Sequence, residues 1–141
     1  MTAERVAVLT GTAGRDFLTE IESKRFLEAA GLPIVATRFA ATREEAVRYG
    51  AELGYPLAMK VMSPEVIHKS DAGGVKLGLV SSDEVERAYD DILISVAKVH
   101  PSARIEGVSV QRMAPAGREV IVGMSKDPEL GPLLMFGLGG V

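Results

Sequence analysis

Hydrophobic and polar residues along this chain alternate with two different periods. Between residues 82 and 99 the apolar side chains recur at steps of three and four, which is the spacing of one face of an α-helix. These positions are Val85, Ala88, Tyr89, Ile92, Val96 and Val99. In residues 57–62, "LAMKVM", the side chains are expected to alternate between two faces, with Leu57, Met59 and Val61 on one of them. The pattern therefore predicts both helices and strands.

Three helices are expected to begin at the same motif, a hydroxyl residue followed three positions later by glutamate. In this capping box the hydroxyl and the carboxylate satisfy the first free backbone amides of the helix. The motifs are Thr19 with Glu22, Thr42 with Glu45 and Ser81 with Glu84. We expect the first helix to run to Ala30 and the second to Leu53, because Gly31 and Gly54 are typical residues at a helix end.

The remaining patterned segments read as strands, separated by proline and glycine turns. They are residues 32–40, 55–62, 75–80, 103–114, 117–127 and 131–140. The predicted order is helix, strand, helix, two strands, helix and three strands, with the last three forming an antiparallel meander. This order predicts an α+β (mixed α/β) fold.

The same patterns divide the chain into a lead-in segment, 1–17, a first unit, 18–100, and a second unit, 101–141. The boundary is expected near Pro101, where the alternation of helices and strands gives way to strands alone. The second unit ends in "GPLLMFGLGGV", a bare apolar strand whose edge and side chains need cover. We therefore expect the domain to be truncated.

Composition narrows the function classes. The 141 residues include 47% hydrophobic and 25% charged side chains, which is enough to bury a core. A formal net charge of −3 gives no electrostatic reason to expect nucleic acid or an anionic membrane as a partner. The absence of cysteine excludes disulfides, thiolate metal sites and a cysteine nucleophile. With no signal-peptide pattern and no long apolar span, we expect a cytoplasmic protein.

Lys60 is the first candidate for chemistry, because it is a charged residue within an apolar strand. An ammonium group in such a strand must reach water or a partner, since burying it alone is unfavourable. One interpretation is a lysine that extends to the rim of the sheet. The other is a cation directed at a phosphate group.

The segment "HKSDAGG", residues 68–74, adds a histidine and two glycines beside that lysine. Gly73 and Gly74 would let backbone amides approach a ligand and cradle phosphate oxygens, although an ordinary hairpin turn uses the same pair. His68 carries a ring nitrogen that can attack phosphorus, although a loop histidine also caps backbone carbonyls. For His100, after the third helix, the favourable interaction with the helix dipole is a sufficient explanation.

A third group of candidates lies later in the chain. Gln111 and Met113 share one strand face, and Glu119 lies at the start of the next strand. A short length of free backbone there would suit an adenine ring, and the carboxylate would suit ribose hydroxyls. From the residues alone, this segment is also consistent with a hairpin that has a polar rim.

Together these segments resemble the ATP-grasp domain of ADP-forming acyl-CoA synthetases, of the type of the acetyl-CoA synthetase β subunit. The similarity runs from about Leu18 to Val141. It is carried by "LTEIESKRFLEAAGLPI", "GYPLAMKVMSPEVIHKSDAGGVKLGL" and "VQRMAPAGREVIVGMSKDPELGPLLMFGLGGV". The resemblance implies an N-terminal ATP-grasp subdomain at 18–100, containing a phosphate lid, and the first strands of the C-terminal subdomain at 101–141.

The resemblance also implies individual roles. Lys60 corresponds to the lysine that contacts the ATP phosphates, and Gly73 and Gly74 to the lid above them. The hinge whose backbone contacts adenine corresponds to Gln111 and Met113, and the ribose carboxylate to Glu119. His68 corresponds to a phosphate-carrying histidine.

The implied reaction converts acyl-CoA, ADP and phosphate to carboxylate, CoA and ATP through phosphohistidine. ATP or ADP and Mg²⁺ are the implied cofactors, with the magnesium ligands expected beyond this chain. The implied partner is the CoA-binding and ligase domain or subunit of an oligomeric enzyme, and the chain alone is expected to be inactive.

Close variants are a succinyl-CoA synthetase β-like subunit and the synthetase-like part of a protein acetyltransferase. Two other classes stay open from sequence: a module that senses nucleotide without transferring phosphate, and an assembly domain whose last strand pairs with a partner. Retention of both Lys60 and His68 favours the enzyme, because a sensor has no need of the imidazole.

Overall fold

The structure is a computed structural model, and it describes residues 18–139. The expected lead-in segment lies outside the described residues. The elements are α2 Glu20–Glu28, β1 Thr37–Ala40, α3 Arg43–Leu53, β2 Leu57–Met62, β3 Val75–Leu79, α4 Ser82–Val99, β4 Gly107–Arg112, β5 Val120–Asp127 and β6 Gly131–Leu138. The predicted order of helices and strands, and the α+β class, are confirmed.

The helix starts follow the predicted caps. Thr19 forms the full capping box with Glu22 before α2, which ends two residues earlier than expected. Thr42 caps α3, and Ser81 caps α4. The carboxylates of Glu45 and Glu84 accept instead from the amides of Ala41 and Val80, each one residue before its cap. The N-caps were therefore predictable, but only one of the three boxes closes in the standard way.

Strands β1 to β4 form an antiparallel sheet in the order β1-β4-β2-β3. β4 is an interior strand, hydrogen-bonded to β1 on one side and to β2 on the other. The predicted meander from β4 into β5 is wrong, because both edges of β4 are already occupied. β1 is also shorter than expected, since residues 32–36 precede it without strand structure.

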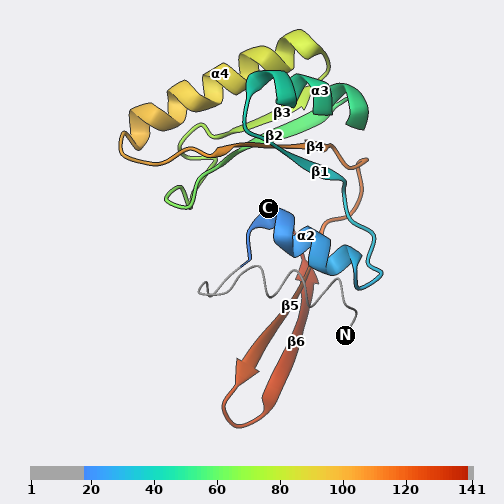
Figure 1. Ribbon diagram of the computed structural model, residues 1–141. Coiled ribbons are helices and arrows are strands. Elements are labelled where there is room, and N and C mark those ends of the chain that lie inside the picture. The colour runs from blue at the N-terminus through green and yellow to red at the C-terminus, as the bar shows by residue number, and fades with distance from the viewer. Residues whose placement is uncertain (1–17, 140–141) are drawn as a thin grey trace.

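Helices α3 and α4 cover one face of this sheet, and α2 lies across the other (Figure 1). The covered face includes Leu57, Met59 and Val61 of β2, which share one face as the alternation predicted and are all fully buried. The apolar face of α4 packs on them, with one exception. Val99 is 55% exposed, because it is the last residue of α4 and helical periodicity does not tell where the underlying layer ends.

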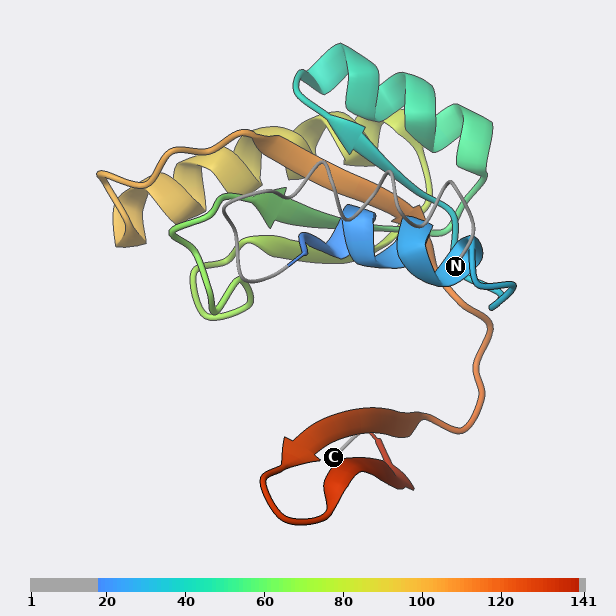
Figure 2. The ribbon, with the colours of Figure 1, turned by 60° about the horizontal axis from the view of Figure 1, so that its bottom comes forward.

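Strands β5 and β6 pair with each other in a separate antiparallel hairpin, which lies apart from the sheet (Figure 2). Large apolar side chains are exposed on it. They are Val120, Ile121, Val122, Met124, Leu130, Leu133, Leu134, Met135, Phe136 and Leu138. The four-stranded sheet thus extends past Pro101 to Arg112, while the division of the chain into subdomains at residue 101 stays a prediction.

Candidate functional site

Lys60 lies on the face of β2 that α3 and α4 leave uncovered. Its ammonium nitrogen is 3.2 Å from Oε1 of Glu20, in the first turn of α2. The requirement for a partner or water is therefore met by a carboxylate 40 positions earlier in the chain. Both side chains are largely withdrawn from solvent, with exposed fractions of 28% and 23%.

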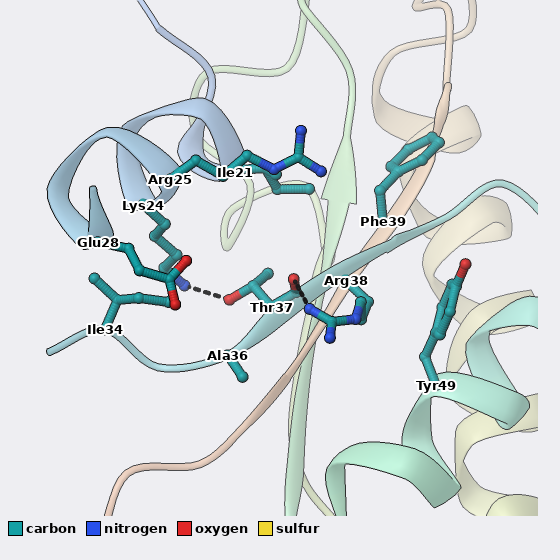
Figure 3. A pocket seen from close by; sticks show the side chains of 10 residues that line it. All are labelled: Ile21, Lys24, Arg25, Glu28, Ile34, Ala36, Thr37, Arg38, Phe39 and Tyr49. Carbon is teal, nitrogen blue, oxygen red and sulfur yellow. Dashed lines mark hydrogen bonds between the residues drawn. The ribbon is translucent and has the colours of Figure 1, made fainter. Parts of the chain in front are cut away.

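Glu20 also pairs with Lys24, one helical turn further along α2. The two groups are 3.1 Å apart. From there the Lys24 ammonium reaches the sheet, donating to Oγ1 of Thr37 at 2.7 Å and to Oε1 of Gln111 at 2.5 Å. Figure 3 shows Lys24 extending from α2 toward Thr37, along the wall of a cavity between α2 and β1. The cluster therefore ties α2 to strands β1, β2 and β4.

The electrostatics of this cluster favour an ionised carboxylate. Burial alone would raise the pKa of Glu20, but the hydrogen bond from Lys24 and the charges of Lys60 and Lys24 outweigh it. The pKa of Glu20 therefore lies below its usual value of 4.5. One carboxylate between two ammonium groups leaves this part of the sheet with a net positive charge.

Lys60 and His68 line one cavity, formed by α2, β2, β3 and the loop between β2 and β3. Its walls are Glu20, Lys60, Ile67, His68, Lys69, Ser70, Asp71, Val75 and Leu77. His68 is exposed, and within residues 18–139 its imidazole makes no hydrogen bond. The interpretation of His68 as a cap for a backbone carbonyl therefore does not hold in this structure. His100 is the C-cap of α4, as expected, and does not line the cavity.

Gly73 and Gly74 close the loop tightly against β2 and α4. Gly73 has φ +68°, and a methyl group on it would lie 2.9 Å from Cβ of Ser95. The Gly73 amide donates to Ser70 O at 3.0 Å, and the Gly74 amide donates to Lys69 O at 2.7 Å. Both amides are thus engaged within the loop that joins β2 to β3, and neither glycine lines the cavity.

The later candidates do not line this cavity. Gln111 directs its side chain to Lys24, and its backbone lies between Thr37 of β1 and Ala58 of β2. Met113 donates its amide to Pro56 O at 2.9 Å and lines a different cavity, beyond the end of β4. Glu119 is exposed, immediately before β5. The structure therefore brings Lys60 and His68 to one cavity and links Gln111 to Lys60 through Lys24 and Glu20, whereas Met113 and Glu119 lie elsewhere.

Comparisons with known proteins show the family of this chain. The sequence model of a family described as an ATP-grasp domain matches residues 10–141. This chain belongs to that ATP-grasp family. The fold of the family binds nucleotide.

Individual relatives make the similarity more specific. Over 124 residues the chain is 47% identical to the β subunit of the ADP-forming acetate–CoA ligase I of Pyrococcus furiosus, covering 88% of this chain and 53% of the relative. It resembles the dinucleotide-forming acetyl-coenzyme A synthetase 1 of Ca. Korarchaeum cryptofilum, solved with coenzyme A and Ca-AMPCP, at 44% identity. The TM-score is 0.89, over 99% of this chain and 61% of that one.

The same synthetase, as a selenomethionine derivative solved with coenzyme A and Mg-AMPPCP, has a phosphohistidine segment pointing towards the nucleotide binding site. This chain matches it at 40% identity with a TM-score of 0.80, over 97% of this chain and 58% of that one. The resemblance found in the sequence is thus confirmed. The ATP-grasp chain spans about half the length of the curated relative described above.

Two further observations concern what the described residues lack. In the range 18–139, no group of three or more histidine, aspartate or glutamate side chains is arranged to hold a metal ion. None of the helices in that range is both long and apolar enough to cross a membrane.

Glu20 and Lys24 are the site residues of this ATP-grasp chain that sequence reasoning missed. The capping box fixed where α2 begins, and so placed both residues on one helix. The direction in which that helix crosses the sheet is set by tertiary structure. The sequence indicates only that Lys60, a lysine within a strand, needs a partner such as a carboxylate, and it contains 19 acidic residues that could fill this role.

Proposed function

We propose that this chain is the nucleotide-binding part of an ADP-forming acyl-CoA synthetase. The overall reaction would convert acyl-CoA, ADP and phosphate to carboxylate, CoA and ATP. The observation that carries the proposal is that a strand lysine and a histidine free of hydrogen bonds, Lys60 and His68, line one cavity in a nucleotide-binding fold. The similarity to ADP-forming acetate–CoA ligases supports the same reaction class.

In this proposal Lys60 holds the phosphate groups of the nucleotide. A cation fixed on a strand can offset the charge of phosphate oxygens without moving during the reaction, and phosphoryl transfer depends mainly on such positioning. The hydrogen bond to Glu20 uses one of the three ammonium hydrogens, so two remain for phosphate oxygens in the cavity.

His68 is the proposed phosphate acceptor. A ring nitrogen of the neutral imidazole attacks the γ-phosphorus of ATP, and a P–N bond forms as the P–O bond to the departing ADP breaks. The phosphoryl group is then passed on to the ligase part, and the reverse sequence makes ATP. His68 lines the cavity and is exposed to solvent, which suits a group that must meet both the nucleotide and a partner.

The other roles are proposed on the family resemblance. Gly73 and Gly74 would act as a lid, which requires their loop to release at least one amide from its internal hydrogen bond. Gln111 and Met113 would contact adenine, and Glu119 the ribose, once the hairpin is brought toward the sheet. Mg²⁺ would neutralise phosphate charge, and its protein ligands are expected beyond this chain, since residues 18–139 contain no group of three or more metal-binding side chains.

The proposed partner is the CoA-binding and ligase domain or subunit, within an oligomeric enzyme. A curated relative is itself the β subunit of such a ligase. A partner of this kind would supply the acyl and CoA sites.

The test is phosphate transfer by the full natural chain with its ligase partner, using magnesium and ATP labelled on the γ-phosphate. We expect acid-labile, base-stable label on the protein. It should disappear in His68→Ala and persist in His100→Ala, a matched control because His100 only caps α4. Unchanged label on this chain in His68→Ala would contradict the assignment. Nucleotide binding without any label would instead favour the sensing module.

A further inference from the structure

We infer that Glu20 is a positioning residue that holds the Lys60 ammonium ready for the nucleotide phosphates. The inference rests on the proposed function, because it assigns Glu20 a task only if Lys60 binds phosphate. Glu20 comes from a helix outside the sheet, so it adds an element to the site that the motif around Lys60 does not contain.

The first argument is that Glu20 is itself held in place. Its Oε1 atom accepts from Lys60 at 3.2 Å and is 3.1 Å from the ammonium of Lys24. Lys24 is anchored in turn by Thr37 and Gln111, which are directly paired residues of β1 and β4. Polar contacts therefore connect α2 to β1 and β4 through Lys24 and to β2 through Lys60, and they fix the position of the Glu20 carboxylate.

The second argument is that α2 is held to the sheet in part by these polar contacts. No side chain of α2 is fully buried, whereas α3 and α4 both have buried residues. The polar bonds of Glu20 and Lys24 therefore contribute to the position of α2 on the sheet. Because Glu20 lies on α2, the position of α2 determines where the Lys60 ammonium is held.

The third argument concerns charge and geometry together. A lysine side chain has many rotamers, and a fixed carboxylate selects the one in which the ammonium lies at the cavity wall. Because Lys24 balances the charge of Glu20, the positive charge of Lys60 remains available to an anion. In protein kinases a strand lysine that contacts the nucleotide phosphates is held by a helix glutamate in a comparable pair.

The opposite effect is also conceivable in electrostatic terms, since a carboxylate beside Lys60 repels a phosphate. If that repulsion dominated, removing the charge of Glu20 would tighten nucleotide binding. The two effects have opposite signs, so one measurement separates them.

The experiment is a double-mutant cycle on ADP affinity, measured by calorimetric titration of the full natural chain with its partner. The variants are Glu20→Gln, Lys60→Met and both together. We expect Glu20→Gln to weaken ADP binding about tenfold, as for loss of a positioning group, and to have no further effect in the Lys60→Met background. Glu28→Gln is the matched control, since Glu28 lies on the same helix but outside the cavity of Lys60 and His68.

The outcomes distinguish this inference from the proposed function. Tighter ADP binding by Glu20→Gln, no change, or an equal loss with and without Lys60 would each overturn the positioning role while leaving nucleotide binding by Lys60 intact. If Lys60→Met binds ADP as well as the natural protein does, the role of Lys60 in the proposed function fails instead. The melting temperatures of all variants show whether a substitution has destabilised the packing of α2 on the sheet.

Discussion

A methyl group added at Gly74 should destabilise the protein by overpacking alone. Gly74 has no positive φ, so alanine strains the backbone little. The new Cβ would lie 2.6 Å from Cγ1 of Val61 and 2.9 Å from the carbonyl oxygen of Lys69. Val61 is fully buried, and the Lys69 oxygen accepts the Gly74 amide, so neither neighbour can move freely.

Overpacking of this kind costs roughly 1–3 kcal/mol. Because one of the two neighbours is backbone, a change of rotamer cannot relieve the contact, and we expect the upper half of that range, about 2–3 kcal/mol. For a chain of this size the loss corresponds to a fall in melting temperature of roughly 6–10 °C. Thermal unfolding followed by circular dichroism measures it.

Three comparisons make the assay specific. Gly78→Ala isolates backbone strain, because Gly78 has φ +73° and no atom within 4 Å of the added methyl; we expect a loss of about 1–2 kcal/mol. Gly117→Ala meets only an ordinary contact at 3.9 Å and should be near neutral. In a Val61→Ala background the additional loss from Gly74→Ala should fall by about half, since its nearest neighbour is gone. Equal stability of the Gly74 and Gly117 variants, or strict additivity of the losses at 61 and 74, would refute the packing described for this loop.

Two other predictions concern the core and the charge cluster. Ile92→Ala should lower the free energy of unfolding by about 3 kcal/mol because Ile92 is fully buried. Ile94→Ala, at a site 54% exposed on the same helix, should lower it by less than about 0.5 kcal/mol. Urea unfolding of both variants measures the difference, and similar losses would contradict the orientation of α4. The pKa of Glu20 is lower in the folded state than in the unfolded state, where it is near 4.5. The ionised carboxylate therefore stabilises the fold at pH values above the unfolded-state pKa, and this stabilisation is lost as the pH falls through the folded-state pKa. The stability difference between the natural protein and Glu20→Gln should therefore be present at pH 7 and vanish in acid, and a difference that grew on acidification would show that the carboxylate is not held ionised.

The sequence was most informative where local structure decides the outcome. Hydroxyl residues at 19, 42 and 81 predicted the three helix starts, because a cap satisfies amides within the same turn. Alternation in β2 predicted which side chains share a face, because a strand has only two faces. Both patterns depend only on residues that are close to one another in the sequence.

Non-local features could not be obtained in this way. β4 looks like the first strand of a meander, but pairing with β1 joins residues 74 positions apart, Thr37 and Gln111. The candidate site shows the same limit. Lys60 was identified from its own strand, while its partner Glu20 depends on how α2 crosses the sheet. For His68, the family resemblance supplied a role that residue chemistry alone left undecided.

The interior position of β4 has a consequence for how the chain is made. During synthesis β1, α3, β2, β3 and α4 all emerge before β4, yet β1 has no partner strand until residue 112 has left the ribosome. A chain ending near Pro101 would hold β1 and β2 apart with a strand-wide gap between them, and Val108 and Val110 would be missing from the core. Closure of this sheet is therefore a late, non-local event in the synthesis of the chain.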